Sequence, residues 1–273
     1  MTSATPHKID DYESLLVALQ NVLGVVVPES QRSCLVERVE PLLSDYKLES
    51  LALLAQGLQG DRADGIKSSV LEAISQSHSD WALSAALSGV LKNYIFSQLP
   101  EQAKILLVGS GYGQLAYAVA MQLAEYEQHN SNNKQAELFA IDSSLSAIKF
   151  AQQATYSPQA LTGLSEEYKK LYTTSSDGSE RRTIKDKIRQ RVHFSQCDLT
   201  EDFQSIGQVD LIICPEVLVY FSNGVKAGIL KQFSTLLKAG GILLTGNNQA
   251  VTPLMKGFER VEHPAGVFYR QKH

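Results

Sequence analysis

The stretch Ile105–Gly113, ILLVGSGYG, decides the fold of this chain. A run of apolar, strand-forming residues leads directly into glycines spaced G-x-G-x-G, and an alanine-rich amphipathic segment, Gln114–Glu125, follows. This order predicts a strand, a tight turn and a helix. Glycine suits a place where a ligand lies against the backbone at the carboxyl end of a strand, because a side chain there would block it. A plain glycine turn before a helix is the alternative interpretation.

The spacing of the glycines indicates the class of ligand. A dinucleotide fingerprint reads G-x-G-x-x-G, and a phosphate-binding P-loop has a lysine after its last glycine. Here Gly109, Gly111 and Gly113 bring the third glycine one residue early, and no lysine follows. This form is typical of methyltransferases that bind S-adenosylmethionine, a cofactor without phosphate. A nicotinamide dehydrogenase is therefore the weaker interpretation.

Strands and helices alternate from Ala103 onward. The predicted strands are Ala103–Val108, Glu137–Ile141, Arg191–Gln196, Val209–Pro215, Gly241–Gly246 and Gly266–Gln271, and the predicted helices are Gln114–Glu125, Ser144–Ala154 and Gly224–Leu237. The alternation predicts an α/β fold, a doubly wound and mostly parallel sheet with helices on both faces. Lys238–Gly241 is predicted to end the last helix with a glycine cap. Tyr168–Arg189 is a polar excursion, with a hairpin expected around Asp177 and Gly178.

The first part of the chain has a helical pattern instead. Apolar stripes at helical spacing run from about Asp11 to Ser77, with a loop expected at Gly60–Gly65 and a kink or a restart of the second helix at Pro41. We therefore expect three parts. They are a small all-α domain over residues 1–77, a linker helix over 78–102 and the α/β domain over 103–273.

Composition excludes several classes of protein. The net charge of −4 over 273 residues argues against a nucleic-acid binder. The 3 cysteines are scattered without a CxxC pair and the 6 histidines are dispersed, so neither a disulfide framework nor a metal site is expected. The first residues lack the apolar core of a signal peptide, and no apolar run approaches the length of a membrane span. We expect a cytoplasmic protein without membrane insertion.

The second predicted strand ends at an acid, Asp142, which is the candidate for the ribose. A carboxylate at this strand end can accept hydrogen bonds from both ribose hydroxyls of an adenosine. The alternative role is the N-cap of the next helix, because Asp142, Ser143 and Ser144 all precede it. The position of the acid after the glycine turn favours the ribose.

The ends of the next two strands supply the other candidates. Asp198 suits the exocyclic amine of adenine and Leu199 its ring, although an aspartate in a turn is nearly as good an explanation. The fourth strand runs into Pro215–Phe221 and should face the middle of the cofactor. Its candidates are Glu216 and Val217 for binding and Tyr220 for orienting the methyl acceptor. A buried strand entering a helix would explain the apolar residues but not Glu216 or Tyr220.

These residues together resemble a known family, the CheR chemotaxis receptor methyltransferases. Leu211–Phe221, LIICPEVLVYF, is similar to the family's LIFCRNVLIYF, and Val192–Leu199 and Leu237–Leu243 resemble two further motifs. The resemblance implies a small helical domain joined to a Rossmann-like S-adenosylmethionine domain. It also implies methylation of glutamate side chains of chemoreceptors, so that the partner is a protein acceptor. The Tyr168–Arg189 excursion stands where the family has a small β-subdomain used for docking to receptors.

The chain departs from the family at positions that matter for chemistry. Gln114 and Leu115 replace the acids after the glycine turn, and Leu83 stands where an active-site arginine is usual. The arginine–asparagine pair of the fourth strand becomes Pro215–Glu216, so we expect Glu216 to take over the cofactor's ammonium group. The second helix, strongly basic in the family, keeps only Arg32 and Arg38.

Two functions stay open on these residues. The first is a methyltransferase of this type with an altered acceptor, for which Arg181 and Arg182 would be the nearest cations. An acceptor carboxylate is already ionised at neutral pH, so the transfer needs no general base. The second is a catalytically silent relative that binds or regulates in a chemotaxis-type pathway. The arginine missing at Leu83 and the missing acid after the glycine turn favour the second, whereas the retained glycines, Asp142 and Tyr220 favour the first.

Overall fold

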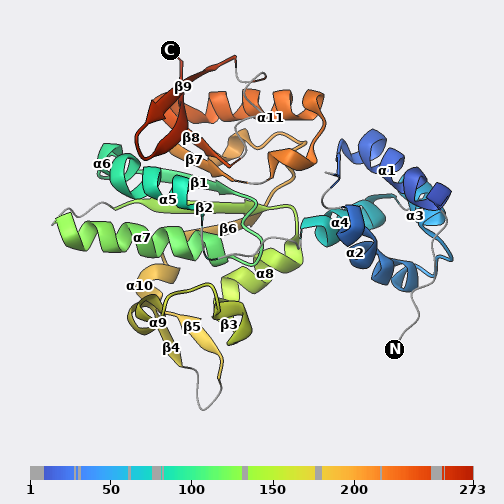
Figure 1. The fold of residues 1–273 in the computed structure, drawn as a ribbon, viewed down its shortest axis with the longest axis horizontal. Helices are drawn as coiled ribbons and strands as arrows, with labels where there is room; N and C mark the ends of the chain where they lie inside the picture. The colour runs from blue at the N-terminus through green and yellow to red at the C-terminus, as the bar shows by residue number, and fades with distance from the viewer. Residues whose placement is uncertain are drawn as a thin grey trace. The chain divides into compact units, whose positions relative to one another are not determined.

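The computed structural model describes residues 9–27, 29, 32–60, 63–75, 81, 83–130, 135–175, 180–215, 217–246, 254 and 256–272. The chain divides into two compact units. The helical unit comprises Met1–Ser77 together with Leu218–Lys226, and the sheet unit comprises His78–Val217 together with Ala227–His273. Figure 1 follows the chain through both by colour.

The helical unit is built from α1 (Ile9–Leu23), α2 (Arg32–Asp45), α3 (Leu51–Gly57) and α4 (Ala63–Ser75). Its core consists of fully buried aliphatic side chains at helical spacing, among them Leu15, Leu19, Val39, Leu51, Leu54 and Val70. The helix α2 continues through Pro41 instead of restarting there. The helix α4 begins at Ala63, inside the stretch expected to be a loop.

A late segment of the chain belongs to the helical unit. The short helix η5 (Leu218–Tyr220) and the first turn of α11 (Asn223–Leu236) follow the strand β7 (Val209–Cys214) in sequence. The Val26 amide donates to the Tyr220 carbonyl at 2.5 Å, and the Ser222 amide donates to the Gly24 carbonyl at 2.7 Å. Val25 and Phe221 form an antiparallel bridge between these bonds. Backbone hydrogen bonds therefore connect this segment to the residues that follow α1.

The sheet unit contains the expected α/β fold. Among the described residues, seven strands form one sheet in the order β6-β2-β1-β7-β8-β10-β9. The strands are β1 (Lys104–Val108), β2 (Glu137–Asp142), β6 (Val192–Gln196), β7 (Val209–Cys214), β8 (Leu237–Thr245), β9 (Phe258–His263) and β10 (Gly266–Gln271). Pairing is parallel from β6 to β8, and β10 pairs antiparallel with β8 and β9. The six predicted strands are all present, and β9 is an additional one.

Helices cover both faces of this sheet. They are α5 (Ala85–Val90), the π-helical turn η2 (Leu91–Ile95), α6 (Phe96–Gln98), α7 (Gln114–Asn130), α8 (Leu145–Gln153), α10 (Asp186–Arg189) and most of α11. Figure 1 shows α7 and α11 on opposite sides of the strands. Right-handed crossovers that lead from the centre of the sheet in opposite directions require this arrangement. The fold is confirmed as doubly wound.

The predicted glycine cap of α11 is wrong. Strand β8 begins at Leu237, directly after α11 ends, and includes Gly240 and Gly241. Leu237 pairs with Val209, and an irregularity in the register follows, where Gly240 has a φ of +73°. The glycines therefore accommodate a bulge within a strand, because pairing with β7 outweighs the local cap signal.

The Tyr168–Arg189 excursion contributes to a small antiparallel sheet of the order β3-β5-β4. Its strands are β3 (Thr155–Tyr156), β4 (Thr173–Ser175) and β5 (Arg182–Ile184), with η3 (Gln159–Leu161) and α9 (Glu166–Tyr172) between β3 and β4. The expected turn at Asp177 and Gly178 lies outside the described residues. We call Thr155–Ile184 the small-sheet region.

Candidate functional site

The glycine turn follows β1 and has the backbone that the sequence predicts. Gly109, Gly111 and Gly113 have φ values of +75°, +49° and +88°, a region that residues with a side chain rarely adopt. A Cβ atom on Gly109 would lie 2.1 Å from Cγ2 of Val217, and one on Gly113 would lie 2.8 Å from the Cβ of Ala151. The amides of Gly109 and Ser110 both donate to the Ile141 carbonyl. The turn is thus fixed to the end of β2.

Asp142, at the end of β2, holds this turn by a side-chain hydrogen bond. Its side chain is buried, with 7% of the residue exposed. One carboxylate oxygen accepts from the Gly111 amide at 2.8 Å, and the other accepts from the Ser144 amide at 3.0 Å. The cap of α8 is Ser144, whose hydroxyl accepts from the Ala147 amide. The structure therefore brings together the glycines and the acid, and gives the capping role to another residue. The ribose role stays a prediction.

Two buried polar atoms in the turn have no hydrogen-bond partner within the described part of the chain. They are the hydroxyl oxygen of Ser110, a residue that is 3% exposed, and the amide oxygen of Gln114, a residue that is 6% exposed. Leaving a buried polar group unsatisfied costs about 1–3 kcal/mol, so each such atom requires an explanation. A bound polar ligand would be one. Sequence reasoning missed Ser110, although its place between the first two glycines was a usable signal.

Asp198 and Leu199 lie just beyond the end of β6, next to Asp142. Strand β6 pairs with β2 up to Asp142 and Gln196, and the Cys197 amide donates to the Asp142 carbonyl at 2.9 Å. One oxygen of Asp198 accepts from both the amide and the hydroxyl of Thr200 at 2.8 Å, so this carboxylate stabilises the turn after β6. Leu199 is buried. Their contacts with adenine stay predictions.

The residues after β7 fall into three groups. Val217 packs over Gly109 and so belongs to the turn. Glu216 lies outside the described residues. Tyr220 lies in η5, within the helical unit, where its carbonyl accepts from Val26. The structure thus places Val217 against Gly109, whereas Tyr220 belongs to the helical unit.

The position expected for an arginine is part of the apolar core. Leu83 is buried and belongs to the same core as Trp81 and Leu87. Of the two arginines expected to replace it, Arg182 donates through Nε to the Thr173 hydroxyl at 2.6 Å and through Nη2 to the Lys169 carbonyl at 3.3 Å. Arg182 therefore holds the small-sheet region together, whereas Arg181 is exposed.

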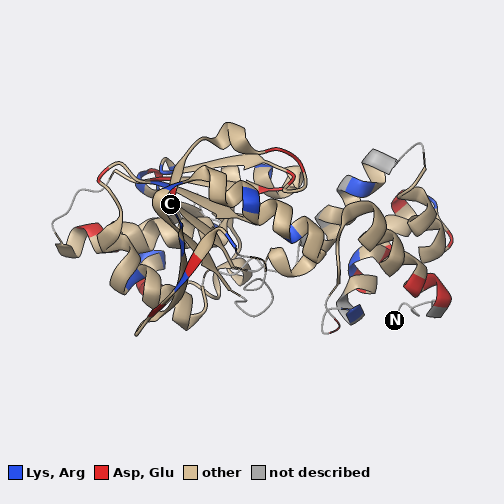
Figure 2. Ribbon diagram, turned by 90° about the horizontal axis from the view of Figure 1, so that it is seen from above, with Lys and Arg blue, Asp and Glu red and all other residues tan. Residues whose placement is uncertain are grey.

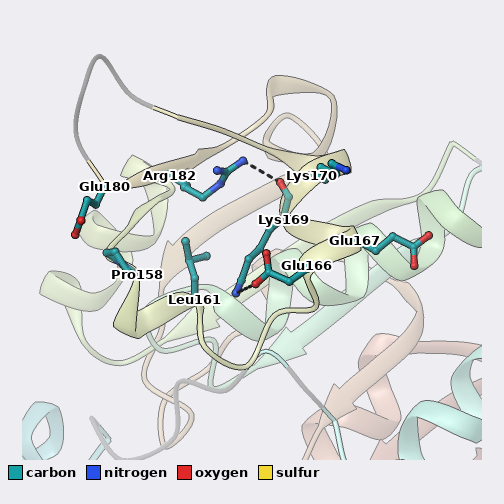
Figure 3. A pocket seen from close by; sticks show the side chains of 8 residues that line it. All are labelled: Pro158, Leu161, Glu166, Glu167, Lys169, Lys170, Glu180 and Arg182. Atoms are coloured by element: carbon teal, nitrogen blue, oxygen red, sulfur yellow. Dashed lines mark hydrogen bonds and ion pairs between the residues drawn. The ribbon is translucent and has the colours of Figure 1, made fainter.

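A pocket of about 560 Å³ opens in the small-sheet region. It is lined by Pro158, Leu161, Glu166, Glu167, Lys169, Lys170, Glu180 and Arg182. Figure 3 shows Lys169 pointing to Glu166, and the ion pair between them is 2.7 Å long. Both signs of charge line the pocket over an apolar floor, which suits a peptide with mixed charges more than a simple anion.

Charge is also mixed on the helical unit. Along α2, Arg32 and Arg38 alternate with Glu37, Glu40 and Asp45, and α1 begins with two acids. Figure 2 shows basic and acidic residues interspersed on these helices. Within the described ranges, no helix is both long and apolar enough to span a membrane. No group of three or more histidines, cysteines or acids is placed to hold a metal ion in that part of the chain.

Comparisons with known proteins agree with this geometry. Residues 80–267 match the family described as CheR methyltransferase, SAM binding domain. A chemotaxis protein methyltransferase of Vibrio anguillarum is 30% identical over 96% of this chain and 97% of its own length. Chemotaxis protein methyltransferase Cher2 of Pseudomonas putida is 27% identical over 96% of this chain and 98% of its own. Chemotaxis protein methyltransferase 1 of Pseudomonas aeruginosa is 29% identical over 96% and 98%.

Proposed function

The chain belongs to the CheR methyltransferase family, and on that premise we propose that it methylates a glutamate carboxylate on the cytoplasmic part of a chemoreceptor. S-adenosylmethionine is the methyl donor. Relatives named chemotaxis protein methyltransferases match almost the whole length of the chain, which supports a protein acceptor and a place in the cytoplasm. The small-sheet region, with its pocket of mixed charge, is the proposed docking site for that acceptor.

One observation carries the proposal, namely the carboxylate of Asp142 held against the glycine turn by the Gly111 amide. A carboxylate offers about four acceptor sites, which allows ribose hydroxyls to bind beside backbone amides. The unsatisfied atoms of Ser110 and Gln114 lie in the same turn and fit a ligand that brings donors, such as an ammonium group. These features fit S-adenosylmethionine.

When bound, the cofactor supplies an electrophilic methyl group on a positively charged sulfur. A glutamate acceptor with a pKa near 4.3 is already ionised, so this chain needs no general base. Its residues bind and orient instead. Gly109, Gly111, Gly113 and Asp142 would hold the adenosine, with Asp198 and Leu199 at the adenine and Val217 beside the turn. From the sequence we further propose Glu216 as the partner of the ammonium group and Tyr220 as the residue that orients the acceptor.

The first experiment measures binding of S-adenosylmethionine and its demethylated product by calorimetry. Replacing Asp142→Asn removes a charged hydrogen-bond acceptor, so we expect affinity to fall by about tenfold to a hundredfold. Asp210→Asn is the matched control. Asp210 is an acid at the start of β7 that accepts from the Lys104 amide and from Lys238. It should lower stability but leave affinity unchanged, and equal effects of both variants would refute the assignment of Asp142.

The second half of the experiment tests the acceptor. The wild-type protein is incubated with methyl-labelled S-adenosylmethionine and a purified receptor cytoplasmic fragment. We expect label on glutamate as a methyl ester that is released by mild base, and a reduced rate with Asp142→Asn. Binding of the cofactor without labelled glutamate would refute the receptor as acceptor and leave the cofactor site standing.

A further inference from the structure

The glycine turn is supported by a tyrosine from outside the fingerprint. Tyr156 lies in β3 of the small-sheet region, is fully buried, and donates from its hydroxyl to the Tyr112 carbonyl at 2.7 Å. Tyr112 is the residue between the second and third glycines. The same hydroxyl would lie 3.1 Å from a Cβ atom on Gly113. The turn and the small-sheet region therefore meet at this side chain.

This hydrogen bond holds one particular peptide plane. The Tyr112 carbonyl and the Gly113 amide belong to the same peptide unit, which is planar, so they rotate together. At the opposite edge of the plane, the Gly113 amide donates to the Ser110 carbonyl at 2.9 Å. Hydrogen bonds therefore hold both polar groups of this peptide unit. Gly113, on one side of the plane, would otherwise make it easier for the plane to turn over, because glycine adopts positive and negative φ with similar ease.

The ring of Tyr156 is itself fixed by its neighbours. Trp81 packs edge-on against it with the ring centres 5.0 Å apart, and Phe150 does so at 5.7 Å. The Trp81 indole donates to the Ala160 carbonyl at 2.6 Å. Burial raises the pKa of Tyr156 well above its usual value, so the phenol keeps its proton at physiological pH. It is therefore a permanent donor in a defined place.

We propose that Tyr156 is a positioning residue of methyl transfer, which sets the conformation of the glycine turn and hence the affinity for the cofactor. The inference rests on S-adenosylmethionine binding at this turn. It does not depend on the acceptor. Because Tyr156 is part of β3, cofactor affinity becomes sensitive to the state of the small-sheet region, and binding energies coupled in this way act in both directions.

The test compares Tyr156→Phe with Tyr117→Phe in the full-length protein. Each substitution keeps the aromatic ring and removes one buried hydroxyl group that donates to a backbone carbonyl. The Tyr117 bond goes to Ala151 at 2.9 Å, outside the turn. Unfolding midpoints check that the two losses of stability are similar. Calorimetric titration with S-adenosylhomocysteine then measures affinity.

We expect Tyr156→Phe to weaken binding by about threefold to tenfold, the value of one hydrogen bond, and Tyr117→Phe to leave it within error of wild type. Equal affinities of both variants, whether reduced or not, would overturn the proposal, since Tyr156 would then only contribute packing. Failure of the receptor assay with intact cofactor binding contradicts the proposed function instead and leaves this comparison unaffected.

Discussion

Replacing Gly109 by alanine should damage the sheet unit through two separable effects. The first is conformational, because the φ of +75° at Gly109 places any residue with a Cβ atom in the left-handed region. That strain costs about 1–2 kcal/mol. The second is steric, because the new Cβ atom would lie 2.1 Å from Cγ2 of Val217, far inside ordinary contact distance. Overpacking of this kind costs about 1–3 kcal/mol.

Gly207 offers a control for the steric effect. Its φ is also positive, at +78°, but nothing lies within 4 Å of the position that a Cβ atom would occupy. Because its ψ is 179°, Gly207 lies in a region that is almost exclusive to glycine, so Gly207→Ala should lose about 1–3 kcal/mol for conformational reasons alone. Gly109→Ala should lose about 2–5 kcal/mol. Adding Val217→Ala to Gly109→Ala should return its cost toward that of the control.

Urea unfolding followed by tryptophan fluorescence measures these differences. Trp81 is the single tryptophan of the chain and lies in the sheet unit with both glycines, so its emission reports the unit that is perturbed. If Val217→Ala relieves Gly109→Ala no more than it relieves Gly207→Ala, Val217 does not press on the turn and the steric reasoning is refuted.

Two further predictions concern titrating groups of the sheet unit. Burial alone would raise the pKa of Glu125, but hydrogen bonds from Tyr168 at 2.6 Å and Lys92 at 3.0 Å outweigh it and leave the pKa lowered. The stabilisation is therefore present above the unfolded pKa near 4.3 and is lost as the pH falls through the lower folded value. Lys92→Met should cost up to about 1 kcal/mol at pH 7 and progressively less below pH 4 in urea unfolding. Lys169→Met should change little, because the side chain of its partner Glu166 is 88% exposed. A pH-independent cost of Lys92→Met would contradict this reasoning. Burial, with Asp198 and Glu201, raises the pKa of Cys197 to about 11. Alkylation of Cys197 at pH 8, followed by peptide mass spectrometry, should thus be on the order of a hundredfold slower than that of a free cysteine, and rapid labelling would show that the thiol is less buried.

The parts of the fold that depend on local pattern could be predicted from the sequence. Strand β1 and the glycine turn follow from an apolar run beside residues that alone tolerate positive φ, and the alternation after Ala103 predicts the doubly wound sheet. The errors fall where distant pairing decides. Gly240 has the sequence context of a helix cap, yet it lies in β8 because Leu237 pairs with Val209. Of the two outcomes that Pro41 allowed, a kink or a restart, the restart does not occur, since α2 is continuous across it.

The candidate site shows the same division. Asp142 could be placed near the glycines because both follow neighbouring strands, and its hydrogen bond to Gly111 joins them. Tyr156 could not be found in this way, since it lies 43 residues beyond the third glycine, in the small-sheet region, whose strands are only two or three residues long. Ser110 stands between the first two glycines, but only the structure shows that its hydroxyl is buried without a hydrogen-bond partner among the described residues.

The late segment Leu218–Lys226 sets a limit on how this gene can be shortened. A fragment that starts at the sheet unit would contain the complete family match from residue 80 and would seem self-sufficient. It would nevertheless strip the Tyr220 carbonyl and the Ser222 amide of the partners that Val26 and Gly24 provide. Deleting residues 1–77 would therefore remove hydrogen-bond partners from a segment that lies inside the family match. Residues 1–77 and the segment Leu218–Lys226 therefore have to be expressed and engineered together.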